Sequence, residues 1–153
     1  MARASRCDVL AISSSGGHWV ELTRLFPAFD GLSVEYACTD AGRAADVPPG
    51  RFHVVTDANK QTPWSLVVCM FQVMRLVFDS RPRVIISTGA APGLIAIVCG
   101  KLIGARAVWL DIFGLVDRMT LSGRMVKPFA DLYLVQWPHL AKPDGPQFRG
   151  SLL

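Results

Sequence analysis

The sequence predicts an α/β fold: a Rossmann-like parallel sheet with helices on both faces. Short apolar runs alternate with helical segments along the chain, and this alternation indicates right-handed βαβ units. Hydrophobic residues make up 51% of the 153 residues and charged residues only 18%, which is enough for a large buried core. Because no repeat or low-complexity linker divides the sequence, we expect one domain over residues 1–153.

The first half of the chain should supply three strands and two helices. Residues 7–13 form a compact apolar run closed by serines and glycines, as in a buried parallel strand that enters a tight turn. A helix follows from His18 and is limited by Pro27. Residues 33–39 and 52–56 are the next strands, and Pro63 begins a long helix that ends near Arg81.

The second half should continue the alternation from a strand at residues 84–87. A turn rich in small residues joins that strand to an apolar helix. The elements that we expect after the turn are a helix at 94–103, a strand at 105–110, a helix at 121–130 and a strand at 132–136.

Charge and cysteine usage narrow the classes of function. The net charge of +4 favours an anionic partner, such as a phosphate or an acidic lipid. Nucleic acid is the least favoured partner because the basic residues are scattered and form no known binding module. The cysteines lie in apolar stretches without metal-ligand spacing, so we expect no metal site and four buried, reduced thiols in a reducing compartment: Cys7, Cys38, Cys69 and Cys99.

A glycine-containing loop follows the first strand. Ser14, Ser15, Gly16 and Gly17 would lie at the carboxyl edge of the sheet, where open α/β sheets bind ligands and a helix N-terminus can receive a phosphate. The loop is neither a dinucleotide fingerprint nor a P-loop. We predict that it binds the phosphates of a substrate; the alternative is that these residues only form a turn and cap the helix.

A second loop of small residues follows the strand at 84–87. Thr88 and Gly89 would lie at another strand end that leads into a helix, and two such loops side by side would form a cleft rich in backbone donors. We assign these two residues to the same phosphate-binding site. Close packing of helix on strand is the alternative, above all for Ala90 and Ala91.

Three polar residues near these loops are candidates for catalysis. His18 lies in the first turn of a helix, where the positive helix end would favour a neutral ring that can accept a proton. Glu21 lies on the same helical face, and it would either orient His18 or simply complement the helix dipole. Asp111 ends a strand and would act as a base or a hydroxyl ligand, or it would cap the turn that follows.

Residues 64–78 are apolar around nearly the whole helix circumference. The segment is shorter than the roughly 20 residues that span a bilayer. Trp64, Phe71, Arg75 and Phe78 fit a helix that lies on a membrane with anionic headgroups, and a central core helix is the alternative. The N-terminal apolar run is too short for a secretory signal, so we expect a peripheral protein on the cytoplasmic face of a membrane.

Together the motifs resemble one known family. The motif residues are Ser14 to His18 with Glu21, Ser87 to Gly89, Leu121-Ser122-Gly123-Arg124, Val135-Gln136-Trp137-Pro138 and the end from Phe148. In this order they are similar to the membrane-associated subunit of the bipartite N-acetylglucosaminyltransferase of dolichol-linked oligosaccharide synthesis, and to its bacterial PssD-type exopolysaccharide counterparts. The resemblance covers the chain from about Asp8 to its end.

The resemblance implies the acceptor-side, N-terminal half of a GT-B glycosyltransferase divided into two chains. A separate subunit would bind the UDP-sugar donor, and no cofactor is implied. The C-terminal tail, with Phe148, Gly150, Leu152 and Leu153, would dock onto that subunit to form a heterodimer.

The expected reaction is inverting transfer of a sugar from a UDP-sugar to a polyprenyl-diphosphate-linked saccharide. His18 would be the general base, and the two loops would hold the acceptor diphosphate. Two alternatives stay open at this point: a non-catalytic membrane scaffold for the partner, and a Rossmann-like nucleotide-binding protein.

Overall fold

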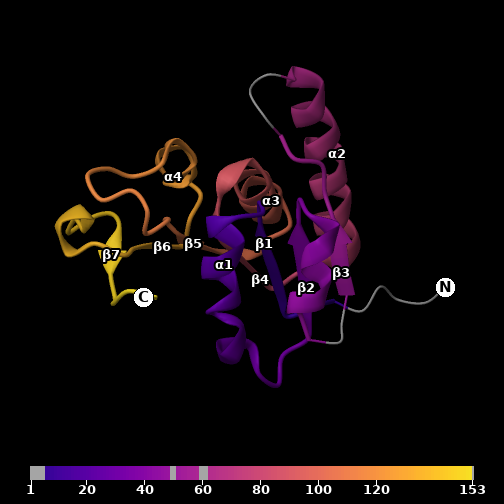
Figure 1. Ribbon diagram of the computed structural model, residues 1–153, viewed down its shortest axis with the longest axis horizontal. Helices are drawn as coiled ribbons and strands as arrows, with labels where there is room; N and C mark the ends of the chain where they lie inside the picture. The colour runs from indigo at the N-terminus through magenta and orange to yellow at the C-terminus, as the bar shows by residue number, and fades with distance from the viewer. Residues whose placement is uncertain (1–5, 49–50, 59–61, 153) are drawn as a thin grey trace.

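The fold is a single seven-stranded sheet in which every pair of neighbouring strands is parallel. The computed structural model describes residues 6–48, 51–58 and 62–152. The strands lie in the order β3-β2-β1-β4-β5-β6-β7 (Figure 1). Their bounds are β1 Val9–Ser13, β2 Val34–Cys38, β3 Arg51–Val54, β4 Val84–Gly89, β5 Arg106–Leu110, β6 Leu132–Val135 and β7 Gln147–Phe148.

Four α-helices and three short 3-10 helices connect the strands in the described part of the chain. The α-helices are α1 Gly17–Thr23, α2 Pro63–Ser80, α3 Ala90–Leu102 and α4 Leu121–Val126. The 3-10 helices are η1 Phe26–Phe29, η2 Ala41–Asp46 and η3 Pro138–Leu140. Both the fold class and the strand-helix alternation that the sequence predicted are confirmed.

Two helix bounds differ from the prediction. α3 begins at Ala90 instead of residue 94, because Pro92 falls in its first turn, where an amide hydrogen would have no helical partner in any case. α4 ends at Val126 instead of residue 130, and a turn follows in which the amides of Phe129 and Ala130 both donate to the Val126 carbonyl. The edge strand β7 was not predicted, since two residues carry no periodic signal.

Alternate residues of the central strands β1, β2 and β4 face two different core layers. In β1, Leu10 and Ile12 pack on the side of α2 and α3, whereas Val9 and Ala11 pack on the side of α1 and η1. The first layer includes residues from α2, α3, α4 and the strands, and the second centres on Trp19, which makes edge-on contacts with Phe26 and Phe52. Both faces of the sheet are therefore covered around β1.

Helix α2 is buried along one side only. Cys69, Val73 and Val77 face the core and are 0% exposed. On its outer side Trp64 is 76% exposed, Phe71 58% and Phe78 41%. The alternative of a central core helix is therefore wrong. None of the described helices has the length and apolar character needed to cross a membrane.

The strand order reverses direction at β1. From β1 the chain moves outward through β2 to β3, and α2 then returns it to β4 on the other side of β1. Such a switch point opens a crevice at the carboxyl ends of the two central strands, where open α/β sheets bind their ligands. The residues after β1 and β4 consequently lie at the expected ligand site.

Candidate functional site

The ends of β1 and β4 lie side by side, with Ser13 paired with Gly89 in the sheet register. His18, in the first turn of α1, extends from one strand end to the other. Its ring Nδ1 is 2.9 Å from the carbonyl oxygen of Thr88, and the Thr88 hydroxyl donates to the His18 carbonyl oxygen at 2.5 Å. A carbonyl can only accept, so this contact is a hydrogen bond when Nδ1 carries the ring hydrogen.

Gly89 makes room for this histidine ring. A Cβ atom on Gly89 would lie 2.5 Å from Cε1 of His18 and closer still to Nδ1, far inside van der Waals contact. Gly89 has φ 140°, and Ala90, which follows, has φ 66°, an uncommon conformation for a residue with a side chain. The backbone at the start of α3 thus leaves the space that the His18 ring occupies.

The assignment of Thr88 and Gly89 to phosphate binding needs correction. The Thr88 hydroxyl is used by the His18 carbonyl, and the Gly89 amide donates to the Ser87 hydroxyl at 3.1 Å. Thr88 is also 0% exposed. The Thr88 hydroxyl therefore joins β4 to α1, and the Gly89 amide is used within the end of β4. Neither donor is available to a ligand.

The glycine loop after β1 is more open. Gly16 and Gly17 are exposed, Gly16 has φ 77°, and Ser14 and Ser15 are half-buried. The Ser15 amide donates to the Thr39 hydroxyl at 3.0 Å, so this one backbone donor is already used. The loop keeps the predicted position at the ligand edge of the sheet.

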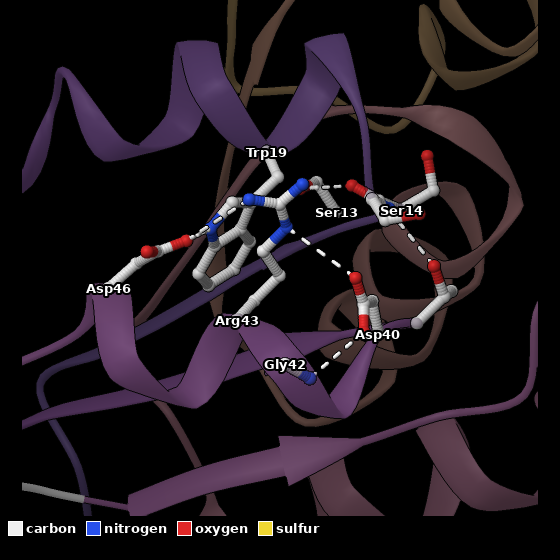
Figure 2. A network of polar contacts seen from close by, with 9 residues as sticks. Ser13, Ser14, Trp19, Asp40, Gly42, Arg43 and Asp46 are labelled. Atoms are coloured by element: carbon white, nitrogen blue, oxygen red, sulfur yellow. Dashed lines mark hydrogen bonds and ion pairs between the residues drawn. The ribbon is translucent and has the colours of Figure 1, made fainter.

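Arg43, from η2, lies beside this loop and was not predicted as a site residue. Figure 2 shows its guanidinium near Ser13 and Ser14, between Asp40 and Asp46. Nε of Arg43 is 3.6 Å from the Asp40 carboxylate, and Nη1 is 3.6 Å from that of Asp46. Asp46 also accepts from the Trp19 indole at 2.9 Å. No local motif marks Arg43, because it reaches the loop only through the pairing of β1 with β2.

Glu21 does not orient His18. Its side chain is buried, and its carboxylate accepts hydrogen bonds from the Phe113 amide at 3.1 Å and from Nε2 of Gln136 at 2.5 Å. It therefore fixes the segment after β5 against the end of β6. The ring of His18 is oriented by the Thr88 carbonyl instead.

Asp111 has the capping role that the sequence left open. Its carboxylate accepts from the Thr120 amide at 2.9 Å, from the Thr120 hydroxyl at 2.6 Å and from the Trp109 indole at 3.3 Å. With 3% exposure and these partners, Asp111 holds the loop before α4. The structure supports this role over that of a base or a hydroxyl ligand.

Packing around Asp111 explains the glycine of the Leu-Ser-Gly motif. A Cβ on Gly123 would overlap the Tyr133 hydroxyl and would lie 2.8 Å from Oδ1 of Asp111. Thr120 caps α4 by accepting the Gly123 amide hydrogen at 2.9 Å. Burial, together with the nearby Asp111 carboxylate, raises the pKa of the Tyr133 phenol well above its usual range, so this hydroxyl stays protonated.

The C-terminal tail lies against its own domain. The Leu152 amide donates to Oε1 of Gln136 at 3.1 Å, and Arg24 on α1 donates to the Leu152 carbonyl at 2.7 Å. Phe148 is in β7 at the sheet edge and is 38% exposed, and Gly150 is exposed with φ 107°. Leu153, the last residue predicted for partner docking, lies outside the described residues.

An apolar cleft of about 480 Å³ begins at His18. It is bounded by the start of α3, by α4 and by the beginning of α2. Its lining residues are His18, Ala58, Leu66, Ala90, Ala91, Leu94, Thr120, Leu121, Ser122 and Met125. Apolar walls with a few hydroxyls and one imidazole are typical of a small-molecule site.

The prediction of buried thiols is confirmed for all four cysteines. Burial raises the pKa of Cys7 and of Cys69 to about 11, so both are protonated and unreactive at neutral pH. Within residues 6–48, 51–58 and 62–152, no group of three or more His, Cys, Asp or Glu side chains is arranged to hold a metal ion.

Solved structures share this fold. MurG from Acinetobacter baumannii superimposes with a TM-score of 0.75 at 10% identity, over 94% of this chain and 45% of MurG. UDP-GlcNAc 2-epimerase from Methanocaldococcus jannaschii gives a TM-score of 0.64 at 7% identity, over 84% of this chain and 39% of the epimerase. The chain thus corresponds to about half of a GT-B glycosyltransferase in fold, as predicted.

Sequence relatives define the family. The family model described as "Oligosaccharide biosynthesis protein Alg14 like" matches residues 43–152. A UDP-N-acetylglucosamine transferase subunit from Yarrowia lipolytica is 34% identical over 45% of this chain and 35% of its own length. Its namesake from Schizosaccharomyces pombe is 27% identical over 87% of this chain and 77% of its own length. The chain belongs to the Alg14-like family, which confirms the resemblance seen in the sequence motifs.

Proposed function

We propose that this chain is the acceptor-side subunit of a two-chain glycosyltransferase that moves a sugar from a UDP-sugar to a polyprenyl-diphosphate-linked saccharide. The names of the relatives support the donor class and the division into subunits. The observation that carries the proposal is the position of His18 at the switch point of the sheet, where it lines an apolar cleft and is held through Nδ1.

His18 suits the role of general base. As the acceptor hydroxyl attacks the anomeric carbon, the bond from that carbon to the UDP oxygen breaks, and Nε2 of His18 takes the hydroxyl proton. UDP leaves with the bonding electron pair, and the anomeric configuration inverts. The Thr88 carbonyl bonded to Nδ1 stabilises the imidazolium that forms.

The acceptor diphosphate belongs at the glycine loop after β1. Gly16 and Gly17 are exposed there, and the Arg43 guanidinium adds a positive charge on the β2 side of the loop (Figure 2). Asp40 and Asp46 hold that guanidinium in place but also offset its charge. The donor atoms for the diphosphate would therefore come chiefly from the loop backbone.

A partner subunit completes the site with the UDP-sugar. This chain has the fold of about half of MurG, and a GT-B active site lies between two such halves. Val108, Leu132 and Leu134 are half-buried on the face of β5 and β6 opposite the α3 layer, which leaves an apolar surface next to the β7 edge. We assign the partner to this surface and to the nearby tail.

Membrane contact belongs to the outer side of α2. Trp64, Phe71 and Phe78 are exposed there, and the Arg75 side chain is 85% exposed beside Asp79. Leu66, near the start of the same helix, lines the cleft, so α2 contributes to both the outer surface and the site. The cytoplasmic face of the membrane fits the reduced cysteines and the supply of UDP-sugars.

Replacement of His18 tests the function. In the complex assembled with the donor-binding subunit, His18→Ala should lower kcat by roughly 10²- to 10⁴-fold because the proton acceptor is lost. Transfer of radiolabelled sugar to a polyprenyl-diphosphate acceptor measures the rate, and co-purification of the two subunits shows that assembly is intact.

His139→Ala is the matched control, because His139 is exposed and its ring lies at the Val116 carbonyl and the Trp137 ring, outside the cleft. This variant should turn over at the wild-type rate. If His18→Ala also does so, His18 is not the base, and the chain is the scaffold for a partner that carries all of the catalysis.

A further inference from the structure

We propose that Thr88 and Gly89 are positioning residues that hold the His18 ring as its Nδ1–H tautomer, with the Nε2 lone pair left for substrate. The effect on catalysis rests on the proposed function, whereas the tautomer itself does not.

Two hydrogen bonds in opposite directions link His18 to Thr88. The Thr88 carbonyl accepts from Nδ1 at 2.9 Å, and the Thr88 hydroxyl donates to the His18 main-chain carbonyl at 2.5 Å. The first bond selects the tautomer, because only a protonated nitrogen can donate to a carbonyl. The second ties the backbone of α1 to the end of β4, so both the ring and the helix that carries it are fixed.

The space at Gly89 selects the position of the ring. Any side chain there would overlap Nδ1 and Cε1 of His18, because its Cβ would lie within 2.5 Å of both atoms. The Gly89 backbone is itself held by the Ser87 hydroxyl and by the pairing with Ser13. With φ 140° at Gly89 and 66° at Ala90, the chain adopts uncommon conformations at the point of contact. Backbone strain of this kind persists where the surroundings enforce it, and it concentrates at functional sites.

The other two histidines are predicted to have the opposite tautomer. Nε2 of His53 is 2.8 Å from the Glu35 carboxylate, and Nε2 of His139 is 2.5 Å from the Val116 carbonyl. Both partners can only accept, so each of these rings carries its hydrogen on Nε2. One spectrum of the chain therefore contains the test and two internal controls.

The experiment is a long-range ¹H–¹⁵N correlation spectrum of the ¹⁵N-histidine-labelled chain at alkaline pH, where histidine rings are neutral. For His18 we expect a protonated Nδ1 and an unprotonated Nε2, and for His53 and His139 the reverse. Assignment uses His53→Gln and His139→Gln. A neutral His18 with its hydrogen on Nε2 would overturn the proposal.

Variants then distinguish the effect of Thr88 on the His18 ring from that of Gly89. Thr88→Val removes the hydroxyl that ties down the helix, so the His18 tautomers should become mixed, and Thr88→Ser should restore the single tautomer. Gly89→Ala should displace the ring, whereas Gly104→Ala should not. Gly104 also has a positive φ, 76°, but a Cβ at this position would have no atom within 4 Å. If Gly89→Ala fails to fold, the wild-type spectrum and the Thr88 pair still decide the question.

Turnover in the assembled complex completes the test. Thr88→Val should lower kcat about tenfold or more with little change in KM, and Thr88→Ser should recover most of the loss. Wild-type turnover by Thr88→Val, or loss of turnover without any tautomer change, would contradict the positioning role. If the tautomer is as expected but His18→Ala remains active, the proposed function fails while the positioning of the ring stands.

Discussion

His18, Glu21 and Asp111 lie near one edge of the sheet, but their side chains have different roles. Glu21 and Asp111 are buried and accept hydrogen bonds from Phe113, Gln136 and Thr120. His18 is only half-buried and lines the cleft. A carboxylate whose oxygens are satisfied inside the protein gains little by accepting a substrate proton, because its internal donors would lose their partner. Of the three, His18 is the residue suited to act on a substrate.

The strained Ala90 gives a prediction about stability. Ala90→Gly should raise the free energy of unfolding by roughly 0.5–1 kcal/mol, since the penalty for a side chain at φ 66° exceeds the added entropy of the unfolded chain. Denaturant unfolding measures the change. Arg81→Gly is the control, because Arg81 has φ 45° at the end of α2 and should show a gain of similar size. Loss of stability in Ala90→Gly alone would mean that the Ala90 methyl group packs in a way that outweighs the strain.

At the scale of the element, α2 has two faces with different surroundings. Its inner face joins the core through Cys69, Val73 and Val77, and its outer face presents aromatic side chains to the surroundings. The sequence showed a helix that is apolar on nearly all sides, which fits both a core helix and a membrane-lying helix. Because α2 packs against α3 on one side and its aromatic outer side is exposed, the structure excludes the central core helix (Figure 1).

Substitution on the outer face tests the membrane contact. The double variant Phe71→Ser/Phe78→Ser should bind vesicles of phosphatidylcholine and phosphatidylglycerol at least tenfold more weakly, because two exposed aromatic side chains no longer enter the interface. Its free energy of unfolding should change by less than about 1 kcal/mol, since neither side chain is buried. Vesicle sedimentation measures binding.

Leu32→Ser serves as the control for this pair. Leu32 is 47% exposed next to η1, away from α2. We expect wild-type vesicle binding for this variant. Equal binding by wild type and the double variant would remove α2 from the membrane contact and leave the basic residues or a partner to supply it.

At the scale of the whole molecule, the chain covers 45% of MurG in fold, and the proposed function places the UDP-sugar on a second chain. We therefore predict that the isolated chain gives no measurable heat with UDP-N-acetylglucosamine in isothermal titration calorimetry, while the assembled complex binds it. The isolated donor-binding subunit is the control. Micromolar binding by this chain alone would favour the alternative of a Rossmann-like nucleotide-binding protein.

The sequence by itself determined the α/β class, the order of strands and helices, the placement of two small-residue loops at strand ends, and the family. These properties depend on local periodicity, on turn residues and on motif order. All three can be recognised from residues that are close together in the sequence. The exceptions were the short strand β7, the start of α3 and the end of α4, whose signals are too brief.

Only the tertiary structure decided which polar groups are free for chemistry. His18 is hydrogen-bonded to Thr88, and Glu21 is hydrogen-bonded to Gln136 and Phe113. The Leu152 backbone is hydrogen-bonded to Gln136 and Arg24. The partners in each case are far apart in the sequence, so no local pattern predicts these bonds. Folding brings donors and acceptors from distant strand ends together, and whichever groups find partners there are lost to a ligand. For that reason the sequence could name three candidate catalytic residues at the edge of the sheet, whereas the fold shows that of these three only His18 lines the cleft.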